Sequence, residues 1–238
     1  MPHLDQTRRR PPAGRRFALA LLTLALLVMV LLSPTPARAN APQPHPFVAD
    51  YQLQVSGWPD ARVSHRLSRH GDWWESEMRA AIRLASGHER SRFRLDGDAL
   101  AASAYSSGYR LLGIGGSYRL GHDDLRELPD RQTALIELSR RAANGHCQAN
   151  PPCTIRFVDH KGREERLDYR PLAPVAQRLP SGETVQATRL EAWNPDKPER
   201  RFFFAFHPRL PGLLLDVEYH RDGERQSHLR LDSLEITE

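Results

Sequence analysis

The chain has 238 residues, with 34 Lys and Arg against 29 Asp and Glu. The excess of positive charge lies in residues 1–39, which contain six Arg and one Asp, so residues 40–238 carry 28 basic and 28 acidic side chains. A chain with this balance has no excess of positive charge to neutralise nucleic-acid phosphates, so nucleic acid is not expected as a partner, although a local Arg patch is still possible. Its length is sufficient to bury one core without a metal or a disulfide lattice and predicts a single domain over residues 47–238.

Residues 1–39 have the pattern of a signal peptide. An arginine-rich start precedes an apolar run of sixteen residues, Phe17–Leu32, and an A-x-A motif ends at Ala39. We expect cleavage between Ala39 and Asn40 and export to the periplasm or out of the cell. Because the run is slightly short of the roughly 20 residues that span a bilayer, an uncleaved anchor is the alternative. Membrane contact is expected only through this segment, before cleavage.

Alternation of apolar and polar residues dominates the rest of the chain, after a flexible proline-rich lead-in at residues 40–46. A period of two is typical of antiparallel strands buried on one side. The expected strands cover Phe47–Val55, Ala61–Leu67, Trp73–Leu84, Arg90–Leu95, Ala99–Tyr105, Ile155–Val158, Glu165–Tyr169, Glu183–Trp193, Phe202–Phe206, Leu213–Tyr219 and Leu229–Leu231.

A glycine-rich stretch, Ser106–Leu120, interrupts this pattern with the sequence GIGGSY. It is not a nucleotide-binding loop, because Tyr118 stands where G-x-G-x-x-G requires its third glycine and the lysine of a P-loop is missing. We expect a bulged or kinked strand, or a mobile loop.

One helix is predicted over Asp130–Ala143, with Asp130 as its N-cap. Its apolar positions fall within about a 100° arc, which favours a helix that plugs one face of a curved sheet. The residues expected on the apolar face are Ala134, Leu135, Leu138 and Ala142. The residues expected to face away are Arg131, Glu137, Arg140 and Arg141.

Three turns are predicted from the requirement that apolar residues face apolar residues across a hairpin. Each assignment fixes a register that a structure can test. The turns and pairs are His70-Gly71, with Leu67 opposite Trp74; His160–Gly162, with Ile155 opposite Leu167; and Arg221–Gly223, with Leu215 opposite Leu229 and Leu213 opposite Leu231.

Cys147 and Cys153 are the only cysteines. In an exported protein, a pair this close predicts a disulfide that closes a small loop. A redox or nucleophilic cysteine beside His146 is the rival interpretation. The two prolines between the cysteines and the lack of a C-x-x-C motif disfavour it.

The chain resembles the exported bacterial proteins of domain-of-unknown-function family 3108. The resemblance covers roughly Pro46–Glu235 and rests on PFVADYQLQVSG, SRHGDWWESEMRA, the helix sequence DRQTALIEL, and PSGETVQATRLEAW followed by RRFFFAFHPRLPGLLLDVEYHRDGERQSHLRLDSLE. The chain departs from the family where a Trp-Leu pair often opens the final strand block and Phe203-Phe204 stands instead. The resemblance implies a curved antiparallel β structure in the cell envelope. It supplies no activity and no catalytic residue.

The predicted fold is therefore mainly β: a single curved antiparallel sheet or partly open barrel, with one amphipathic helix on its concave face. The favoured function is non-catalytic binding or chaperoning in the envelope, with a hydrophobic ligand or an envelope protein as partner. Dense Phe, Leu and Tyr on alternating faces favour the ligand, and Gly113–Gly116 could gate an opening.

Two other functions are considered. An envelope hydrolase lacks a G-x-S-x-G, H-E-x-x-H or zinc-type motif, so no catalytic, cofactor or metal residue is assigned. The best polar cluster, Asp216 with His220 and His228, is interpreted as solvated strand-face residues. A structural partner of an envelope assembly could use an exposed tryptophan as an anchor. The candidates are Trp58, Trp73 and Trp193.

Overall fold

The structure is a computed structural model that describes residues 42–145 and 147–237. The expected signal peptide, its cleavage site at Ala39 and Asn40, and His146 lie outside the described residues. Within the described residues, no helix combines the length and apolarity needed to cross a membrane.

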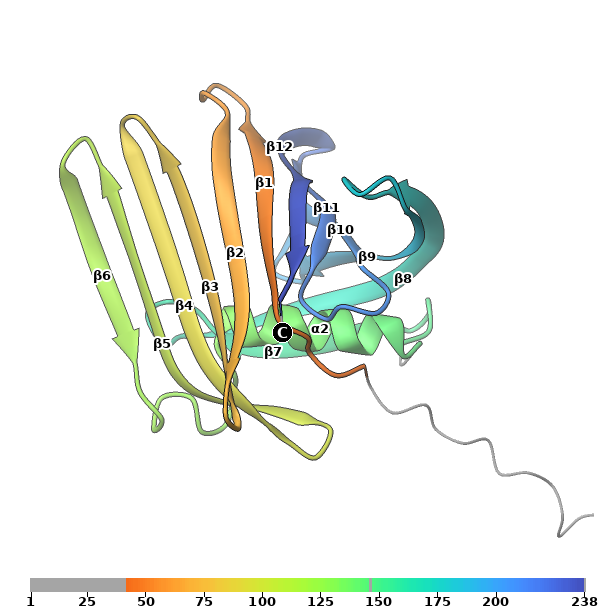
Figure 1. Ribbon diagram of the computed structural model, residues 1–238, viewed down its shortest axis with the longest axis horizontal. Helices are drawn as coiled ribbons and strands as arrows, with labels where there is room; N and C mark the ends of the chain where they lie inside the picture. The colour runs from red at the N-terminus through yellow and green to blue at the C-terminus, as the bar shows by residue number, and fades with distance from the viewer. Residues whose placement is uncertain (1–41, 146, 238) are drawn as a thin grey trace, which may run out of the picture. The chain divides into compact units, whose positions relative to one another are not determined.

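Twelve strands form one antiparallel sheet in the described part of the chain (Figure 1). The order is β6-β5-β4-β3-β2-β1-β12-β11-β10-β9-β8-β7, so β1 and β12 join two meanders and β6 and β7 are the outer strands. The sheet is not closed into a barrel. The strands are β1 (Phe47–Val55), β2 (Ala61–His70), β3 (Trp73–Ile82), β4 (Ala85–Asp96), β5 (Ala99–Leu111), β6 (Ile114–Leu120), β7 (Cys153–Val158), β8 (Glu164–Arg178), β9 (Thr184–Asn194), β10 (Lys197–Phe206), β11 (Leu214–Arg221) and β12 (Glu224–Ile236).

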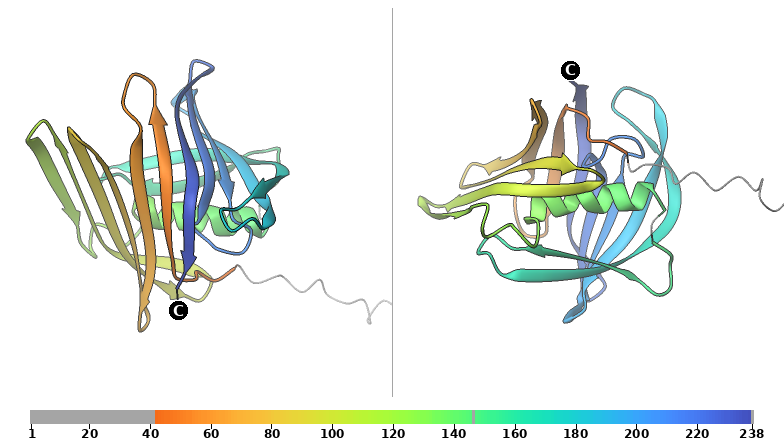
Figure 2. Two further views of the ribbon diagram at one scale, coloured as in Figure 1. Left: turned by 45° about the horizontal axis from the view of Figure 1, so that its top comes forward. Right: turned by 90° about the horizontal axis from the view of Figure 1, so that it is seen from below.

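Helix α2, Arg131–Ala143, lies in the hollow of the curved sheet (Figure 2). Asp130 caps it, since its Oδ1 accepts the backbone N–H groups of Gln132 at 2.9 Å and Thr133 at 3.1 Å. The predicted fold class, helix and cap are confirmed.

Side-chain burial in the strands follows the predicted alternation of apolar and polar residues. In β1, Phe47, Ala49 and Tyr51 are fully buried, and Asp50 and Gln52 between and beyond them are exposed. The main core combines this face of β1 with buried residues of α2, β9 and the segment before β11. The sheet and the helix thus share one core.

The helix orientation differs from the prediction at two positions. Arg131 was expected to face away, but it is partly buried and donates hydrogen bonds to Glu89 and Tyr105 of the sheet. Arg140 was expected to face away from the core, yet it is among the largest fully buried side chains. Helical periodicity sorts residues by polarity and does not detect a polar side chain whose hydrogen bonds are all made inside the protein.

Two of the three predicted registers need correction. His70 pairs with Trp73 across a Gly71-Asp72 turn, so Leu67 faces Ser76 and not Trp74. The turn is displaced by one residue because Gly71 provides the positive φ of 62°. By contrast, Ile155 lies opposite Leu167 as predicted, and Gly162 has the expected positive φ of 76°.

In the last hairpin, a two-residue turn and a bulge keep the apolar residues of both strands on one face. Arg221 pairs with Glu224 across a two-residue turn in which Asp222 and Gly223 both have positive φ, at 53° and 83°. A bulge next to the turn shifts the register by one residue, so Leu229 lies opposite Val217 and the predicted pairs are wrong. The bulge, and not a three-residue loop, returns Leu229 to the side of Val217.

The glycine-rich stretch is neither a kinked strand nor a loop. Strand β5 continues to Leu111 and pairs with β6 without a register shift, and a tight turn at Leu112-Gly113 leads into β6. Glycine is required at Gly115 because a Cβ there would collide with the backbone oxygen of Tyr109.

The predicted disulfide is present. Cys147 and Cys153 are bonded, with their Cα atoms 5.8 Å apart, and the bond ties the segment after α2 to the start of β7. Disulfides are typical of proteins that fold outside the cytoplasm.

Candidate ligand-binding cleft

The side of α2 that faces strands β2–β4 is held by a buried polar network. Ser91 on β4 donates a hydrogen bond to Asp130 Oδ2 at 2.7 Å, and the Thr133 hydroxyl reaches the same oxygen at 2.8 Å. Ser76 on β3 donates to Gln132 Oε1 at 2.7 Å. All five side chains are at most 4 % exposed, so these bonds form away from water and fix the helix in one position.

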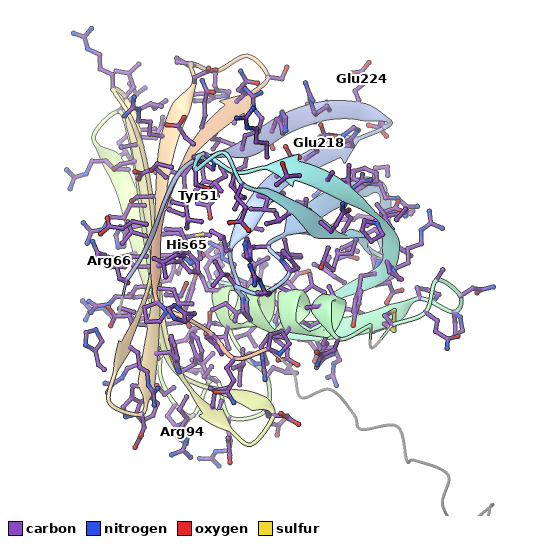
Figure 3. All side chains as sticks on the ribbon, turned by 45° about the vertical axis from the view of Figure 1, so that its right-hand side comes forward. Tyr51, His65, Arg66, Arg94, Glu218 and Glu224 are labelled. Carbon is purple, nitrogen blue, oxygen red and sulfur yellow. A yellow bond between two sulfur atoms is a disulfide. The ribbon has the colours of Figure 1, made fainter. Side chains whose placement is uncertain are left out.

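His65 on β2 completes this network. Its Nε2 lies 2.9 Å from Ser76 Oγ, and its ring packs edge-on against Phe47 at 5.0 Å between centroids. Burial lowers the pKa of His65 to about 3, so the ring is neutral at physiological pH. Figure 3 shows His65 directed to the interior and its neighbour Arg66 directed outward.

The C-terminal half of α2 is anchored in the same manner. The Arg140 guanidinium donates to the carbonyl of Asp98 at 2.8 Å and that of Pro42 at 3.1 Å, and pairs with Glu137 at 3.0 Å. The Gly212 N–H donates to Ser139 Oγ at 2.7 Å. The helix is therefore hydrogen-bonded to the sheet and to flanking loops along its length.

The opposite side of α2 borders an open cleft. The cleft has a volume of about 670 Å³ and lies between α2 and strands β7, β8, β10 and β11. Its floor is mostly apolar, and Phe202 stacks on Tyr219 at 4.9 Å and on Phe204 at 6.0 Å between centroids. The apolar lining residues are Met78, Ala134, Leu135, Leu138, Ile155, Phe157, Leu167, Phe202, Phe204 and Tyr219.

Charged residues gather at the margin of the cleft. Asp159 is hydrogen-bonded to Arg163 at 2.6 Å. Burial acts to raise the pKa of Asp159, but the bonds from Arg163 and Lys161 outweigh it and hold that pKa below its usual range. Lys197 and Arg200 add two cations, of which Arg200 pairs with Glu199 at 3.3 Å and Lys197 forms no ion pair with any residue in the described ranges. Glu89 and Glu165 are further carboxylates in the lining. The margin therefore offers positive charge at Lys197 beside an apolar floor.

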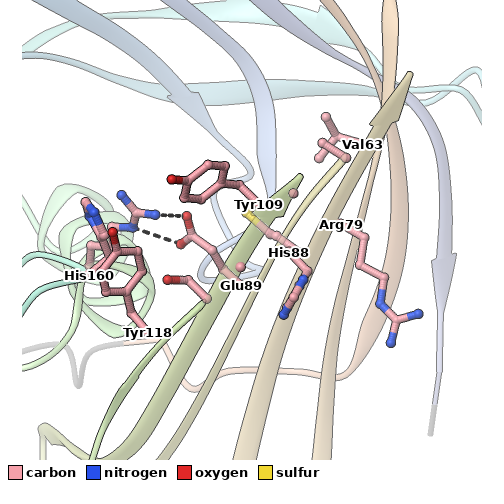
Figure 4. Close-up of a pocket in the computed structure, with 13 residues that line it drawn as sticks. Val63, Arg79, His88, Glu89, Tyr109, Tyr118 and His160 are labelled. Atoms are coloured by element: carbon pink, nitrogen blue, oxygen red, sulfur yellow. Dashed lines mark hydrogen bonds and ion pairs between the residues drawn. The ribbon is translucent and has the colours of Figure 1, made fainter. Parts of the chain in front are cut away.

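A second hollow of about 420 Å³ adjoins the cleft across β2–β6. The two share Met78, Glu89, Arg131 and His160 as lining residues. The Arg131–Glu89 ion pair therefore belongs to the lining of both, and dashed lines mark the contacts of Glu89 in Figure 4. Arg131 also donates to the Tyr105 hydroxyl at 3.1 Å. The concave surface thus forms one groove whose two parts share an ion pair.

The structure brings the polar cluster of the last hairpin together, away from this groove. His228 Nε2 lies 2.7 Å from Asp216 Oδ2. Glu218, which the sequence analysis missed, sits beside them and is held by His220 at 2.9 Å and Arg225 at 2.7 Å. Burial acts to raise the pKa of Glu218, but these partners hold it below its usual value.

This cluster is interpreted as an ion-pair network. Atoms of Asp216, Glu218 and His228 lie within 4.8 Å of one another, as a metal site would require. However, both carboxylates already have cationic or hydrogen-bonded partners. The residues lie on the other face of β11 from Tyr219, which lines the cleft. That no residue binds a metal stays a prediction, which metal analysis of a His220 and His228 double variant would test.

The three tryptophans that were considered as anchors have different environments. Trp58 is 52 % exposed at the β1–β2 turn. Trp73 is covered by Arg92, whose guanidinium lies 4.6 Å from the ring centroid, and Trp193 by Arg201 at 4.7 Å. Only Trp58 keeps a surface suitable for a contact.

The cleft itself was not predicted residue by residue. The alternation of Phe202 and Phe204 and the helical spacing of Leu135 and Leu138 were recognised, but as core. Sequence periodicity shows which residues avoid water and does not show whether two apolar faces meet or leave a gap.

Sequence comparison does not assign the chain to a family: no protein-family model matches it, and no curated protein matches it. Among solved structures, a β-barrel-like protein of domain of unknown function DUF1849 from Brucella abortus is similar, with a TM-score of 0.50 and 12 % identity over 83 % of this chain and 100 % of that one. A MucB structure aligns with a TM-score of 0.37 and 14 % identity, over 84 % of this chain and 56 % of that one. The MucA/MucB complex from Pseudomonas aeruginosa gives 0.39 and 12 %, over 82 % and 52 %.

The chain spans about half the length of the MucB chains, and likenesses of that extent support no conclusion about it. The resemblance to family 3108 is not supported as such, because no family model matches and a solved structure of similar fold carries a different family designation. What the comparisons establish is the fold: an open, barrel-like antiparallel sheet shared with an uncharacterised domain.

Proposed function

We propose that this is an exported, non-catalytic binding protein that shelters the apolar chain of an amphiphilic ligand in the cleft beside α2. The observation that carries the proposal is the uncovered apolar surface of the cleft, formed by Leu135 on the helix and by Phe202 and Phe204 on β10. Apolar surface left open inside a fold favours an apolar occupant at about 25 cal/mol per Å² buried.

The dimensions and charges of the cleft support the same ligand class. A volume of about 670 Å³ lies within the roughly 300–1,000 Å³ typical of small-molecule sites. Lys197, which has no ion-pair partner among the described residues, lies at the margin and suits an anionic head group, such as a carboxylate or phosphate. The expected signal peptide and the disulfide favour a site of action outside the cytoplasm.

A matched pair of variants tests the proposal. Phe202 and Phe203 are neighbours on β10 and point to opposite faces, and only Phe202 lines the cleft. We expect lipid to be recovered by extraction and mass spectrometry of the purified protein, and a fluorescent fatty acid to bind. Phe202→Ser should weaken that binding by about tenfold, because the free energy of burying one large apolar side chain corresponds to a change of at least that size in the dissociation constant.

Phe203→Ser is the control and should leave binding unchanged. The proposal is wrong if the purified protein neither carries lipid nor binds the fatty acid. It is also wrong if both variants reduce binding equally, since that would place the ligand elsewhere.

A further inference from the structure

The β3–β4 and β5–β6 hairpins end in exposed aliphatic side chains. Leu84 is 58 % exposed, Leu112 70 % and Ile114 79 %, and the Leu112 N–H donates to the carbonyl of Leu84 at 2.9 Å. The hydrogen bond joins the two turns, so these side chains project from one continuous surface at the end of the sheet. Figure 1 shows the β1–β2 turn, which bears exposed Trp58, at this same end.

Backbone preference does not explain the aliphatic residue at Leu112. Its φ of 51° is left-handed, a conformation in which Asn, Asp or Gly is favoured over Leu. The turn of the last hairpin uses Asp222 and Gly223 for the same backbone. Leu112 therefore exposes an apolar side chain at a position where solvation and local conformation both favour a polar one.

The charges around these turns have one sign. Residues 79–88 and 107–118 contain no Asp or Glu. Arg83 and Arg110 are exposed beside the aliphatic residues, and neither forms an ion pair with a described residue. Apolar side chains next to unpaired cations match a surface with buried hydrocarbon beneath anionic head groups.

We propose that this pair of hairpin turns docks on the anionic surface of a lipid bilayer, a membrane contact beyond the signal segment to which the sequence analysis confined it. Leu84, Leu112 and Ile114 enter the hydrocarbon boundary, and Arg83 and Arg110 contact the head-group phosphates. The charge argument favours a bilayer over a second copy of the chain, because an identical patch would bring four arginines together. Side chains that project from narrow turns also suit a fluid surface, which needs no matching groove.

The docking surface is distinct from the cleft and does not depend on it. The smaller hollow lies close by, since its lining residues Gly87 and Tyr109 stand within three residues of Leu84 and Leu112. Docking can fail while the cleft still binds fatty acid, and the reverse also holds.

Vesicle co-sedimentation of the purified protein tests the inference. We expect binding to vesicles of phosphatidylglycerol and phosphatidylethanolamine, and weaker binding to phosphatidylcholine alone. Leu112→Asp with Ile114→Asp should reduce partitioning by about tenfold or more, because apolar burial is lost and charge repulsion is added. Ile236→Asp is the matched control, since Ile236 is 49 % exposed on β12 and lies at the opposite end of the sheet (Figure 1).

Three further variants separate docking from misfolding and test the contribution of charge. Leu112→Asn suits the left-handed backbone, so it should fold at least as well as the parent and still bind vesicles less tightly. Arg83→Glu and Arg110→Glu should each weaken binding to the anionic vesicles by about fivefold or more. All variants share one N-terminus, so a retained apolar leader affects them equally.

The inference is overturned if the protein does not bind anionic vesicles, or if the turn variants bind as tightly as Ile236→Asp. It is also overturned if the turn variants abolish self-association in analytical ultracentrifugation while vesicle binding is unchanged, since the surface would then join two copies.

Discussion

The two sides of helix α2 contact the sheet in opposite ways. Toward β2–β4 the helix is bound through hydrogen bonds among buried polar groups, centred on Asp130, Gln132 and Thr133. Toward β7–β11 it presents Leu135, which is only partly buried, to a cleft. An apolar surface alone would favour collapse of the helix onto the nearer strands. The hydrogen bonds to β3 and β4, which we call the polar clamp, hold the helix away from the strands on its other side. The polar clamp therefore explains why the cleft stays open.

Of the changes to the hydrogen-bonded side of the helix, removal of the Asp130 carboxylate should lower the free energy of unfolding most. Asp130→Ala removes the helix cap and leaves Ser91 and Thr133 without their shared acceptor. We expect a loss of about 3 kcal/mol in the free energy of unfolding, from the cap and from buried unsatisfied groups together. Urea denaturation measures it.

The control for this change is Asp123→Ala. Asp123 is exposed and pairs only with Arg126 on the surface, so its removal should change stability by less than about 0.5 kcal/mol. Equal losses in the two variants would show that the buried network does not hold the helix.

The second largest effect should come from acid, which should lower the free energy of unfolding through protonation of His65 in the buried network. The pKa of His65 is lowered by burial to about 3 in the folded protein, against 6.5 when it is exposed. The unfolded chain therefore binds the proton more readily, so this contribution to stability is complete above pH 6.5 and is lost as the pH falls toward 3. At about pH 5 the expected loss is roughly 2 kcal/mol.

Chemical denaturation at several pH values, with and without His65→Gln, isolates this contribution. The variant should lose less stability than the parent between neutral pH and about pH 5, since Gln gains no proton. His70→Gln, at the exposed end of the same strand, is the control. Parallel pH profiles for the parent and His65→Gln would contradict the assignment.

The asymmetry of the helix also marks the limit of what the sequence could predict. The strands, the Asp130 cap and the disulfide follow from local rules: period-two alternation, capping chemistry and cysteine spacing. Arg140 could not be placed, because its burial depends on the carbonyls of Asp98 and Pro42, which are distant in the sequence. Contacts of that kind are set by the tertiary structure.

Registers and cavities are limited in a similar way. The last hairpin was assigned the correct faces and the wrong pairs, because a bulge beside Tyr219 and a longer loop have the same effect on which face a residue occupies. The cleft was missed for a related reason. Phe202 and Leu135 are apolar whether the space between them is filled or open, so only the structure distinguishes core from site.

The smallest expected change in stability comes from a pair of opposite substitutions on α2, one polar to apolar on the hydrogen-bonded side and one apolar to polar on the cleft side. Gln132→Leu leaves the Ser76 hydroxyl without its acceptor and should cost about 2 kcal/mol. Leu135→Gln, on the cleft side, should cost no more than about 1 kcal/mol, because Leu135 is only partly buried and the helix propensities of Leu and Gln are nearly equal. Urea denaturation of both variants gives the difference. A greater cost at Leu135 than at Gln132 would mean that the cleft side, and not the polar clamp, holds the helix, and the uncovered apolar surface would then have to be counted as core.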